Sequence, residues 1–284
     1  MPESDPTRGR PPSPDAAAAP LPGTLGEAVR AEWAAVLRPP YHALATVSFN
    51  AAVMSAAWFL LPPHWNSALF SLHGSLAYAL VLAAWMYADV PATNVLGPDR
   101  QRMMAALDDP VMLRRLLLAK NIVLWSLVTP LCTAIAVVTG VLTHHGLATF
   151  YSVVIIAVIP FGTLGISACV GIAYPYHPMP LRDRWGHRRP WLRMGGRWAV
   201  LVTLPYLLVP IISVTLMTPS LVVWGIAAPR RLSARVPAHH LGAGIAVACL
   251  VATLCSIGGR RVGARMARDR RAALVAFLAD PTSA

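Results

Sequence analysis

Residues 121–143, NIVLWSLVTPLCTAIAVVTGVLT, run for 23 positions without a Lys, Arg, Asp or Glu. A helix rises about 1.5 Å per residue and the hydrocarbon core of a membrane is about 30 Å thick, so about 20 apolar residues can cross it. We therefore predict a transmembrane helix here. Together with five more mainly apolar stretches, it predicts an all-α integral membrane protein with six transmembrane helices. The other five are residues 41–61, 67–90, 148–174, 197–218 and 241–259.

The composition of the whole chain agrees with this fold class. Of its 284 residues, 56% are hydrophobic and only 13% are charged, whereas soluble domains have about 25% charged residues. The net charge of +12 would also suit a nucleic-acid-binding protein, but such a protein needs a basic surface in water. We therefore expect no nucleic-acid partner. The four cysteines lie in apolar stretches without the spacing of a zinc site or disulfide framework, so no metal site is predicted.

The positions of the basic residues predict how the helices are oriented. Of the 24 Lys and Arg residues, 21 lie before the first span, after the last span, or in the links that follow the second and fourth spans. The other three lie between the fifth and sixth spans. Because cytoplasmic segments carry an excess of Lys and Arg, both termini are predicted to be cytoplasmic. Arginine outnumbers lysine 23 to 1, which suggests a GC-rich bacterial genome and hence the bacterial inner membrane.

Three segments are predicted outside the six spans. Residues 1–24 are rich in Pro and Ala without an apolar signal region, and we expect a disordered tail. Residues 260–284 are expected to form a basic cytoplasmic tail that contacts anionic lipids. Residues 25–38 predict an amphipathic helix in the inner interface, and Pro39-Pro40 argue against the alternative, a continuation of the first span. Its apolar side comprises Leu25, Val29, Trp33, Val36 and Leu37, while Glu27, Arg30 and Glu32 face elsewhere.

The fifth apolar stretch is too long for a single straight span. It continues through Pro219 to Ala228 and also contains Pro205 and Pro210. We predict that the span ends at Thr218 and that residues 220–228 form a short re-entrant element on the outer side. The alternative is one kinked, tilted helix.

No catalytic site is predicted in this chain. The only lysine, Lys120, is not part of the Gly-x-x-x-x-Gly-Lys-Ser/Thr motif of a P-loop. None of the twelve acidic residues lies in the middle of a span, where ion-coupled transporters place an ionisable group. The candidates for an embedded enzyme are His73, His144, His145, His239, His240 and Ser167, which we interpret as loop or packing residues. The fourth span also predicts close helix packing at Gly162, Gly165 and Gly171.

The link at residues 91–120 has the most informative pattern. Met103 and Leu107 recur at helical spacing, which predicts an amphipathic helix over residues 99–108. Asp109-Pro110 then has the form of an N-cap and a first-turn proline, starting a second helix that continues into the third span. Such a pair is suited to transmitting force from a cytoplasmic partner. The alternative is a solvated loop with snorkelling arginines.

This link resembles that of type-2 ABC transporter permeases. Asn94-Val-Leu-Gly97-Pro-Asp99 is similar to the family's Asn-x-Phe-Gly-x-Asp-Gly, with Arg100 in place of the last Gly. Pro110 and the stretch Arg114-Arg115-Leu-Leu-Leu-Ala-Lys120-Asn121 resemble its later Pro, Arg, leucines and Gly-Lys-Asn, with Ala119 in place of Gly. Tyr174-Pro175-Tyr176 looks like the aromatic-Pro exit of the fourth span. The layout from residue 25 to residue 259 is also similar.

The resemblance implies a membrane subunit of an ATP-driven exporter, powered by a separate ATP-binding subunit that would hold ATP and Mg. The link would be the coupling helix, so Arg102, Met103 and Leu107 are expected to contact that ATPase. A homodimer, or a heterodimer with a related permease, would form the path for a lipid-like or amphipathic small molecule. The helix start and interfacial anchoring of the third span are assigned to Asp109, Pro110, Arg114, Arg115 and Lys120. The alternatives are a non-transporting anchoring or assembly protein with a basic cytoplasmic face, and a membrane-embedded enzyme.

Overall fold

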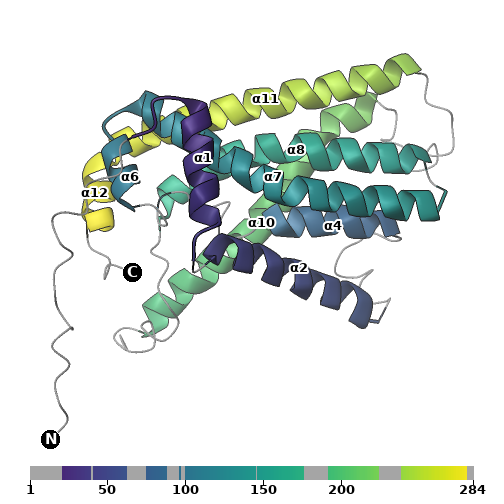
Figure 1. The fold of residues 1–284 in the computed structure, drawn as a ribbon, viewed down its shortest axis with the longest axis horizontal. Helices are drawn as coiled ribbons and strands as arrows, with labels where there is room; N and C mark the ends of the chain where they lie inside the picture. Colours follow the sequence, from purple (N-terminus) through teal and green to yellow (C-terminus); the bar gives the residue numbers. More distant parts are fainter. Residues whose placement is uncertain are drawn as a thin grey trace, which may run out of the picture.

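The described part of this computed structural model comprises residues 21–39, 41–62, 75–87, 96, 100–144, 146–175, 191–223 and 238–279. Every regular element in these ranges is an α-helix (Figure 1), which confirms the all-α class. Each predicted span coincides with a helix. These are α2 (His42–Leu60), α4 (Ser75–Tyr87), α7 (Pro110–Leu142), α8 (Gly146–Ala173), α10 (Trp191–Val223) and α11 (Ala238–Asp269).

Length and composition identify the chain as a multi-pass membrane protein. Within the described ranges, α2, α7, α8 and α11 are long and apolar enough to cross a membrane, while α4 and the second half of α10 are shorter apolar segments. Large apolar side chains also cover the outside of the bundle. More than half of each side chain is exposed at Phe49, Phe59, Leu207, Ile211, Leu250 and Leu254. Soluble monomers rarely expose apolar surface on this scale, whereas lipid solvates it.

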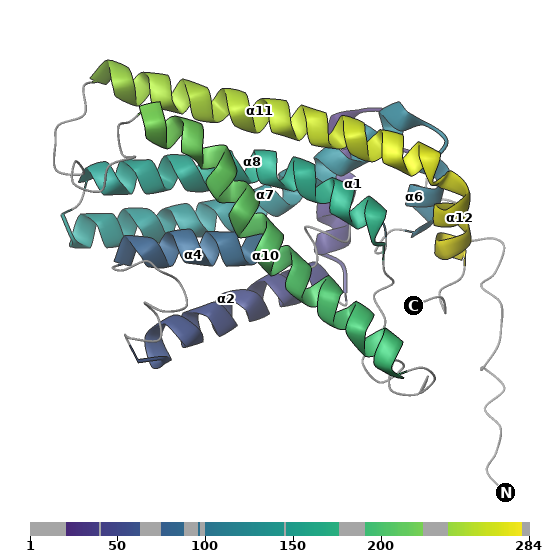
Figure 2. The ribbon, with the colours of Figure 1, turned by 180° about the vertical axis from the view of Figure 1, so that it is seen from behind.

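The long helices alternate in direction along the chain, and three shorter ones lie together at one end of the bundle. In Figure 1, α1 (Leu25–Val36) stands across the bundle, next to α6 (Arg100–Ala106) and α12 (Arg271–Ala279). Figure 2 shows α10 crossing the back of the bundle diagonally. We call the end with α1, α6 and α12 the basal end. All described Lys and Arg residues lie on α1 and the turn after it, α6, the basal parts of α7, α10 and α11, the turn between α11 and α12, or α12.

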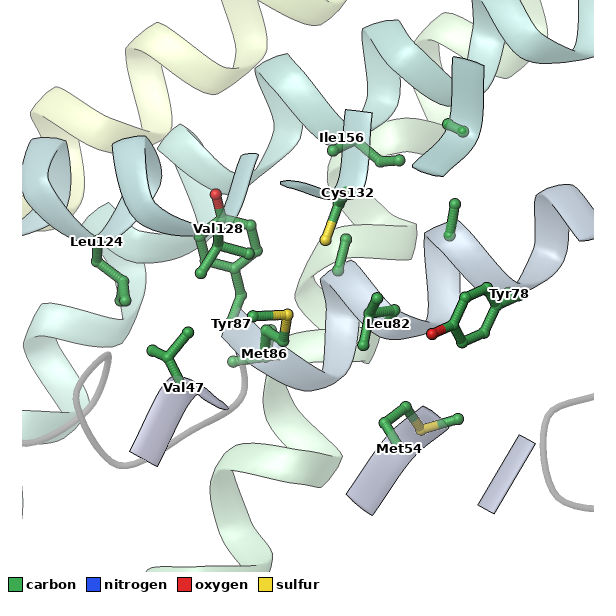
Figure 3. Close-up of a cluster of buried hydrophobic side chains, with 14 of the residues drawn as sticks. Val47, Met54, Tyr78, Leu82, Met86, Tyr87, Leu124, Val128, Cys132 and Ile156 are labelled. Atoms are coloured by element: carbon green, nitrogen blue, oxygen red, sulfur yellow. The ribbon is translucent and has the colours of Figure 1, made fainter. Parts of the chain in front are cut away.

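The membrane core is built around α4 and α7. Tyr87 of α4 points toward Val128 of α7 (Figure 3), while Leu82 and Met86 of α4 lie in the same cluster on the side nearer to α2; all four side chains are buried. Val47 and Met54 of α2 close the other side of α4. Because α2 touches the bundle mainly through these side chains and those near them, most of its remaining surface faces outward.

Single polar contacts join neighbouring helices inside this apolar core. The hydroxyls of Ser55 on α2 and Tyr78 on α4 are 2.7 Å apart, and those of Tyr87 on α4 and Thr129 on α7 are 2.6 Å apart. Trp125 Nε1 of α7 donates to the Ala157 carbonyl of α8 over 2.8 Å. Hydrogen bonds of this kind contribute about 0.6 kcal/mol each within membranes. They also fix the rotation of each helix about its axis, because the hydroxyls must face each other.

Helices α8 and α11 make the closest contact in the bundle, and glycine permits it. A Cβ built on Gly165 would lie 2.5 Å from the Cα of Ser256, and one built on Gly162 would lie 3.1 Å from the Cα of Ala252. A Cβ on Gly259 would overlap the carbonyl of Gly165. Gly171, the third predicted packing glycine, is buried on the same helix. Small residues therefore bring the two backbones into contact along this crossing.

The predicted break at Pro219 is wrong. Helix α10 is continuous from Trp191 to Val223 and includes Pro205, Pro210 and Pro219, so the alternative of one long helix describes these residues better. A proline removes one backbone hydrogen bond, but it does not end a helix whose neighbouring turns remain bonded and whose surroundings hold it in place. Residues 224–228 of the predicted re-entrant element lie outside the described residues.

The two flanking segments contain more structure than the sequence predicts. Helix α11 continues ten residues beyond Gly259 to Asp269, and α12 follows it, so the predicted basic tail at residues 260–284 is helical as far as Ala279. The predicted interfacial helix is present as α1. Most of the predicted tail lies outside the described residues, but Pro22 and Gly23 have defined contacts, described below.

Candidate functional site

The basal end has an apolar core of its own, which we call the basal cluster. It joins α6 to five other helices and contains the side chain at position 96 as well. Its buried members are Ala28, Leu96, Met103, Ala106, Leu107, Leu113, Leu116, Leu117, Ala119, Ala168, Ile172, Ala264, Ala267, Leu274 and Leu278. The cluster therefore makes the basal end one packed body rather than a set of separate loops.

Helix α6, the predicted coupling helix, is fixed by this cluster. Met103 is completely buried and Leu107 is 5% exposed, so both of these predicted partner contacts face the chain's own core. The helix is short, seven residues from Arg100 to Ala106, within the predicted range of 99–108. Gln101, Ala105 and Asp108 are exposed and form its accessible side. A cytoplasmic partner would meet these residues first.

A buried acidic residue connects α1, α6 and α7. The carboxylate of Glu32 on α1 accepts a hydrogen bond from Arg102 on α6 over 3.0 Å and from Lys120 on α7 over 3.1 Å. Glu32 is 6% exposed. An unpaired carboxylate in such a place would be strongly unfavourable, and two cations compensate it. Arg102 was predicted to contact a partner and Lys120 to anchor a helix at the membrane interface. Both are ion-paired within the chain.

The sequence pattern correctly puts Glu32 off the apolar side of its helix, but it does not show that Glu32 is buried. Helix α1 turns Ala28 and Glu32 toward α7, and these are its buried residues. Its apolar side is only partly buried, because Leu25 is 36% and Leu37 57% exposed, while Val29 packs against the basal cluster. The small side chain of Ala28, four residues before Glu32, was the only local sign that this face makes the close contact. The partners of Glu32 are 70 and 88 positions away, beyond the reach of local patterns.

The start of α7 has the predicted cap. The Asp109 carboxylate accepts hydrogen bonds from the backbone N–H of Val111 over 2.8 Å and of Met112 over 3.2 Å, with Pro110 as the first helical residue. The cap satisfies N–H groups that have no partner within the helix. From there α7 continues for 33 residues through the membrane core. One continuous helical rod, with Pro130 inside it, thus connects the turn after α6 to the far end of the bundle.

Arg114 and Arg115 lie in the first turns of this rod. Arg115 donates to the carbonyl oxygens of Pro22 over 3.0 Å and Gly23 over 2.5 Å, and so holds the segment that leads into α1. Arg114 Nε donates to the carbonyl of Pro110 in its own helix over 3.0 Å. The start of α1 itself is fixed by a capping box, in which the side chains of Thr24 and Glu27 bond reciprocally to each other's backbone N–H.

Helix α12 closes the basal end from the other side. Arg271 Nε donates to the carboxylate of Asp108 over 2.6 Å, in an exposed ion pair beside α6. The hydrogen bond from Arg271 lowers the pKa of Asp108 below its ordinary value. Arg270 donates to the carbonyl of Ala173 over 2.6 Å, at the end of α8. Helix α12 and the turn before it therefore connect the segment after α6 to the end of α8.

The residues considered for catalysis are not assembled into a site in the described part of the chain. His144 is exposed in the turn between α7 and α8, with a φ of 55°. Ser167 is buried within α8. His73 and His145 lie outside the described residues, and the side chains of His239 and His240 are not described. Among the described residues, no group of three or more His, Cys, Asp or Glu is placed to hold a metal ion.

The candidate site is therefore a mechanical one: a short exposed helix, an ion-paired connection to α1, and a long helix that begins directly after it. The exposed side of α6 can receive a contact, and α7 can carry a displacement across the bundle. No protein-family model, curated protein or solved structure matches the chain.

Proposed function

We propose that this chain is the membrane-spanning permease subunit of an ATP-driven transporter of the ABC type. A separate ATPase subunit would bind ATP and Mg and would push on α6. Two copies, or this chain and a related one, would enclose the path of a lipid-like or amphipathic small molecule leaving the cell. The resemblance of residues 94–121 to the coupling region of type-2 permeases is the sequence basis of this proposal.

The ion pairs of Glu32 are the structural observation that supports it most. A coupling helix must move as one body with a spanning helix, because a flexible joint would absorb the push from the ATPase. Glu32 bonds to Arg102 on α6 and to Lys120 on α7 at the same time, and Met103 anchors α6 in the basal cluster. These three connections oppose sliding of α6 along α7. A solvated loop would need none of them.

The distribution of charge supports the orientation that this function requires. In our proposal α2, α4, α7, α8, α10 and α11 all span the bacterial inner membrane, with both termini and the basal end in the cytoplasm. The described Lys and Arg residues lie at the basal end, whereas the described turn at Thr143 and His144 has none. This is the asymmetry expected of cytoplasmic and external segments. It supports a cytoplasmic position for α6, on the side where ATP is available.

The contact with the ATPase is proposed for the exposed side of α6. Gln101, Ala105 and Asp108 are accessible, whereas Met103 and Leu107 support the helix from below. Arg102 has a positioning role, because its guanidinium holds Glu32. This assignment changes which substitutions are informative: a substitution at Met103 would disturb folding, while one at Ala105 alters the contact surface alone.

The test uses the full-length chain expressed with the P-loop ATPase encoded nearest to its gene. We expect the two proteins to co-elute from detergent in a stable complex, and Ala105→Glu to remove the ATPase from it. Ala272→Glu is the matched control, since Ala272 is also an exposed helical alanine at the basal end. An ATPase that elutes separately from the wild-type chain would contradict the proposal. A complex that tolerates Ala105→Glu would contradict the contact surface.

The alternative is a membrane anchoring or assembly protein that transports nothing. It would use the same basic face, but it would function without any nucleotide-binding partner. Deleting the ATPase gene and the gene for this chain separates the two functions: a shared phenotype supports the permease, and unrelated phenotypes support the anchor.

A further inference from the structure

We propose that a groove between α1, α7 and α11 binds the phosphate head group of an anionic phospholipid. The groove has a volume of about 370 Å³ and lies at the basal end, where the first turns of α7 meet the middle of α11. Its lining consists of Leu25, Val111, Arg114, Arg115, Leu118, Ile257, Arg260 and Arg261. The sequence predicts only that the basic face contacts anionic lipid; the groove assigns this contact to particular residues.

The four guanidinium groups give the groove an uncompensated positive charge. No carboxylate is among its lining residues, and none of the four arginines takes part in an ion pair within the described part of the chain. Elsewhere at this end, Arg102, Lys120 and Arg271 each have an acidic partner. Within the described part of the chain, the four arginines of the groove therefore remain available to an external anion.

Three of the four arginines are also held in place with donors to spare. Arg115 is oriented by the carbonyls of Pro22 and Gly23, Arg114 by its own helix, and Arg260 by the hydroxyl of Ser256 over 2.9 Å. Each guanidinium has five N–H groups in a planar fork, and such a fork matches phosphate oxygens well. Since these side chains are already positioned, binding a phosphate costs little additional ordering.

The apolar half of the lining identifies the anion as an amphiphile. Val111 is 53% and Ile257 36% exposed, and both lie beside the arginines on helices that are long and apolar enough to cross a membrane. A soluble phosphate would leave these side chains in contact with water. A phospholipid would place its phosphate on the guanidiniums and the start of its acyl chains on Val111, Leu118 and Ile257. Basic pockets between membrane helices on the cytoplasmic side bind lipid head groups in this manner.

The inference does not depend on the transport function proposed above, because a lipid site at this position would serve an anchor equally well. It predicts a saturable site rather than a diffuse attraction. Each guanidinium removed should weaken phosphatidylglycerol binding by about fivefold, the factor that corresponds to one basic residue near an anionic membrane surface.

The experiment measures lipid adducts of the full-length protein by native mass spectrometry in a neutral detergent. The probes are phosphatidylglycerol, phosphatidylcholine and inorganic phosphate. The variant Arg114→Ala/Arg261→Ala is compared with Arg265→Ala/Arg268→Ala, which removes two exposed arginines of α11 outside the groove and has the same net charge. Arg261→Ala alone serves as the mildest change, since Arg261 is exposed.

We expect preferential binding of phosphatidylglycerol over phosphatidylcholine, a loss of about fivefold in Arg261→Ala and a larger loss in the double groove variant. The control pair should bind like the wild type. Equal losses in the two double variants would overturn the proposal in favour of diffuse electrostatics. Equal binding of phosphatidylcholine would also overturn it, and displacement of the lipid by millimolar inorganic phosphate would identify a soluble-anion site instead.

Discussion

The carboxylate of Glu32 lies 3.1 Å from the ammonium group of Lys120, the only lysine in the chain, 88 positions later in the sequence. The same carboxylate holds Arg102 over 3.0 Å. One side chain of α1 thus positions both α6 and the beginning of α7, a helix long and apolar enough to cross a membrane. The properties of the basal end follow in large part from this arrangement.

Replacing Glu32 by Gln is expected to destabilise the protein strongly. The substitution keeps the size of the side chain but leaves Arg102 and Lys120 without their buried counter-ion, and breaking a buried pair in this way costs about 3 kcal/mol or more. The thermal midpoint of unfolding in detergent should fall by several degrees. Asp269→Asn is the control, because it removes one negative charge at an exposed position. Equal midpoints for the two variants would show that the ion pairs contribute nothing to stability.

Gly165→Ala should separate α8 from α11. Its Cβ would lie 2.5 Å from the Cα of Ser256, and because that atom belongs to the backbone the helix itself must shift. Overpacking of this kind costs about 1–3 kcal/mol. Gly258→Ala, one turn from the same crossing, has no atom within 4 Å of the added Cβ and should be neutral or stabilising by up to about 1 kcal/mol. Equilibrium unfolding in mixed micelles measures both, and an unchanged Gly165→Ala protein would refute the close contact.

The attachment of α12 to α6 should weaken in acid. The pKa of Asp108 is lowered from its ordinary value of 3.8 by the hydrogen bond from Arg271. A carboxyl whose pKa is lower in the folded state stabilises that state fully above its unfolded pKa, and the contribution disappears as the pH falls through the folded pKa. After correction for the intrinsic pH dependence of amide exchange, hydrogen exchange of the α12 amides should therefore accelerate below about pH 4. The effect will be small, because the pair is exposed and screened by salt.

Asp108→Asn provides the control for that measurement. It should raise the exchange rate of α12 at neutral pH and remove the additional increase in acid. An acid response that persists unchanged in Asp108→Asn would assign it to another carboxyl.

Labelling of introduced cysteines should establish the orientation of the bundle. Gly146→Cys lies at the first residue of α8, next to the turn after α7, where an added Cβ meets no other atom within 4 Å. A membrane-impermeant maleimide is expected to label it in intact cells, whereas Arg268→Cys on the basal side should react only after lysis. The wild-type protein is the background control for the four native cysteines. Labelling of Arg268→Cys but not Gly146→Cys in intact cells would reverse the proposed topology.

The sequence predicted the features that depend on neighbouring residues. Long uncharged stretches marked the positions of α2, α7, α8 and α11, and the dipeptide Asp109-Pro110 marked the start of α7 within one residue. Both are local effects: hydropathy requires only a stretch of apolar side chains, and a cap requires only a carboxylate next to free N–H groups.

Features that depend on distant contacts were not predictable in the same way. The continuation of α10 through Pro219 depends on what surrounds the helix, while a proline in the sequence shows only the hydrogen bond that is lost. Met103 and Leu107, which form an apolar stripe, were expected to face a partner because the link resembles a coupling helix. The same stripe suits burial, and the chain supplies its own cover from α12 through Leu274 and Leu278.

The basal cluster draws on residues from Ala28 to Leu278, and this has a consequence for biosynthesis. Membrane helices can insert one after another as the ribosome releases them. Helix α6, however, cannot complete its packing until α12 has also been synthesised. Through most of translation, the apolar side of α6 therefore lacks part of its cover, and Asp108 lacks Arg271. Assembly of this end must be one of the last steps in the maturation of the protein, so a ribosome that stalls before residue 271 would leave a chain that is inserted in the bilayer but not closed at its basal end.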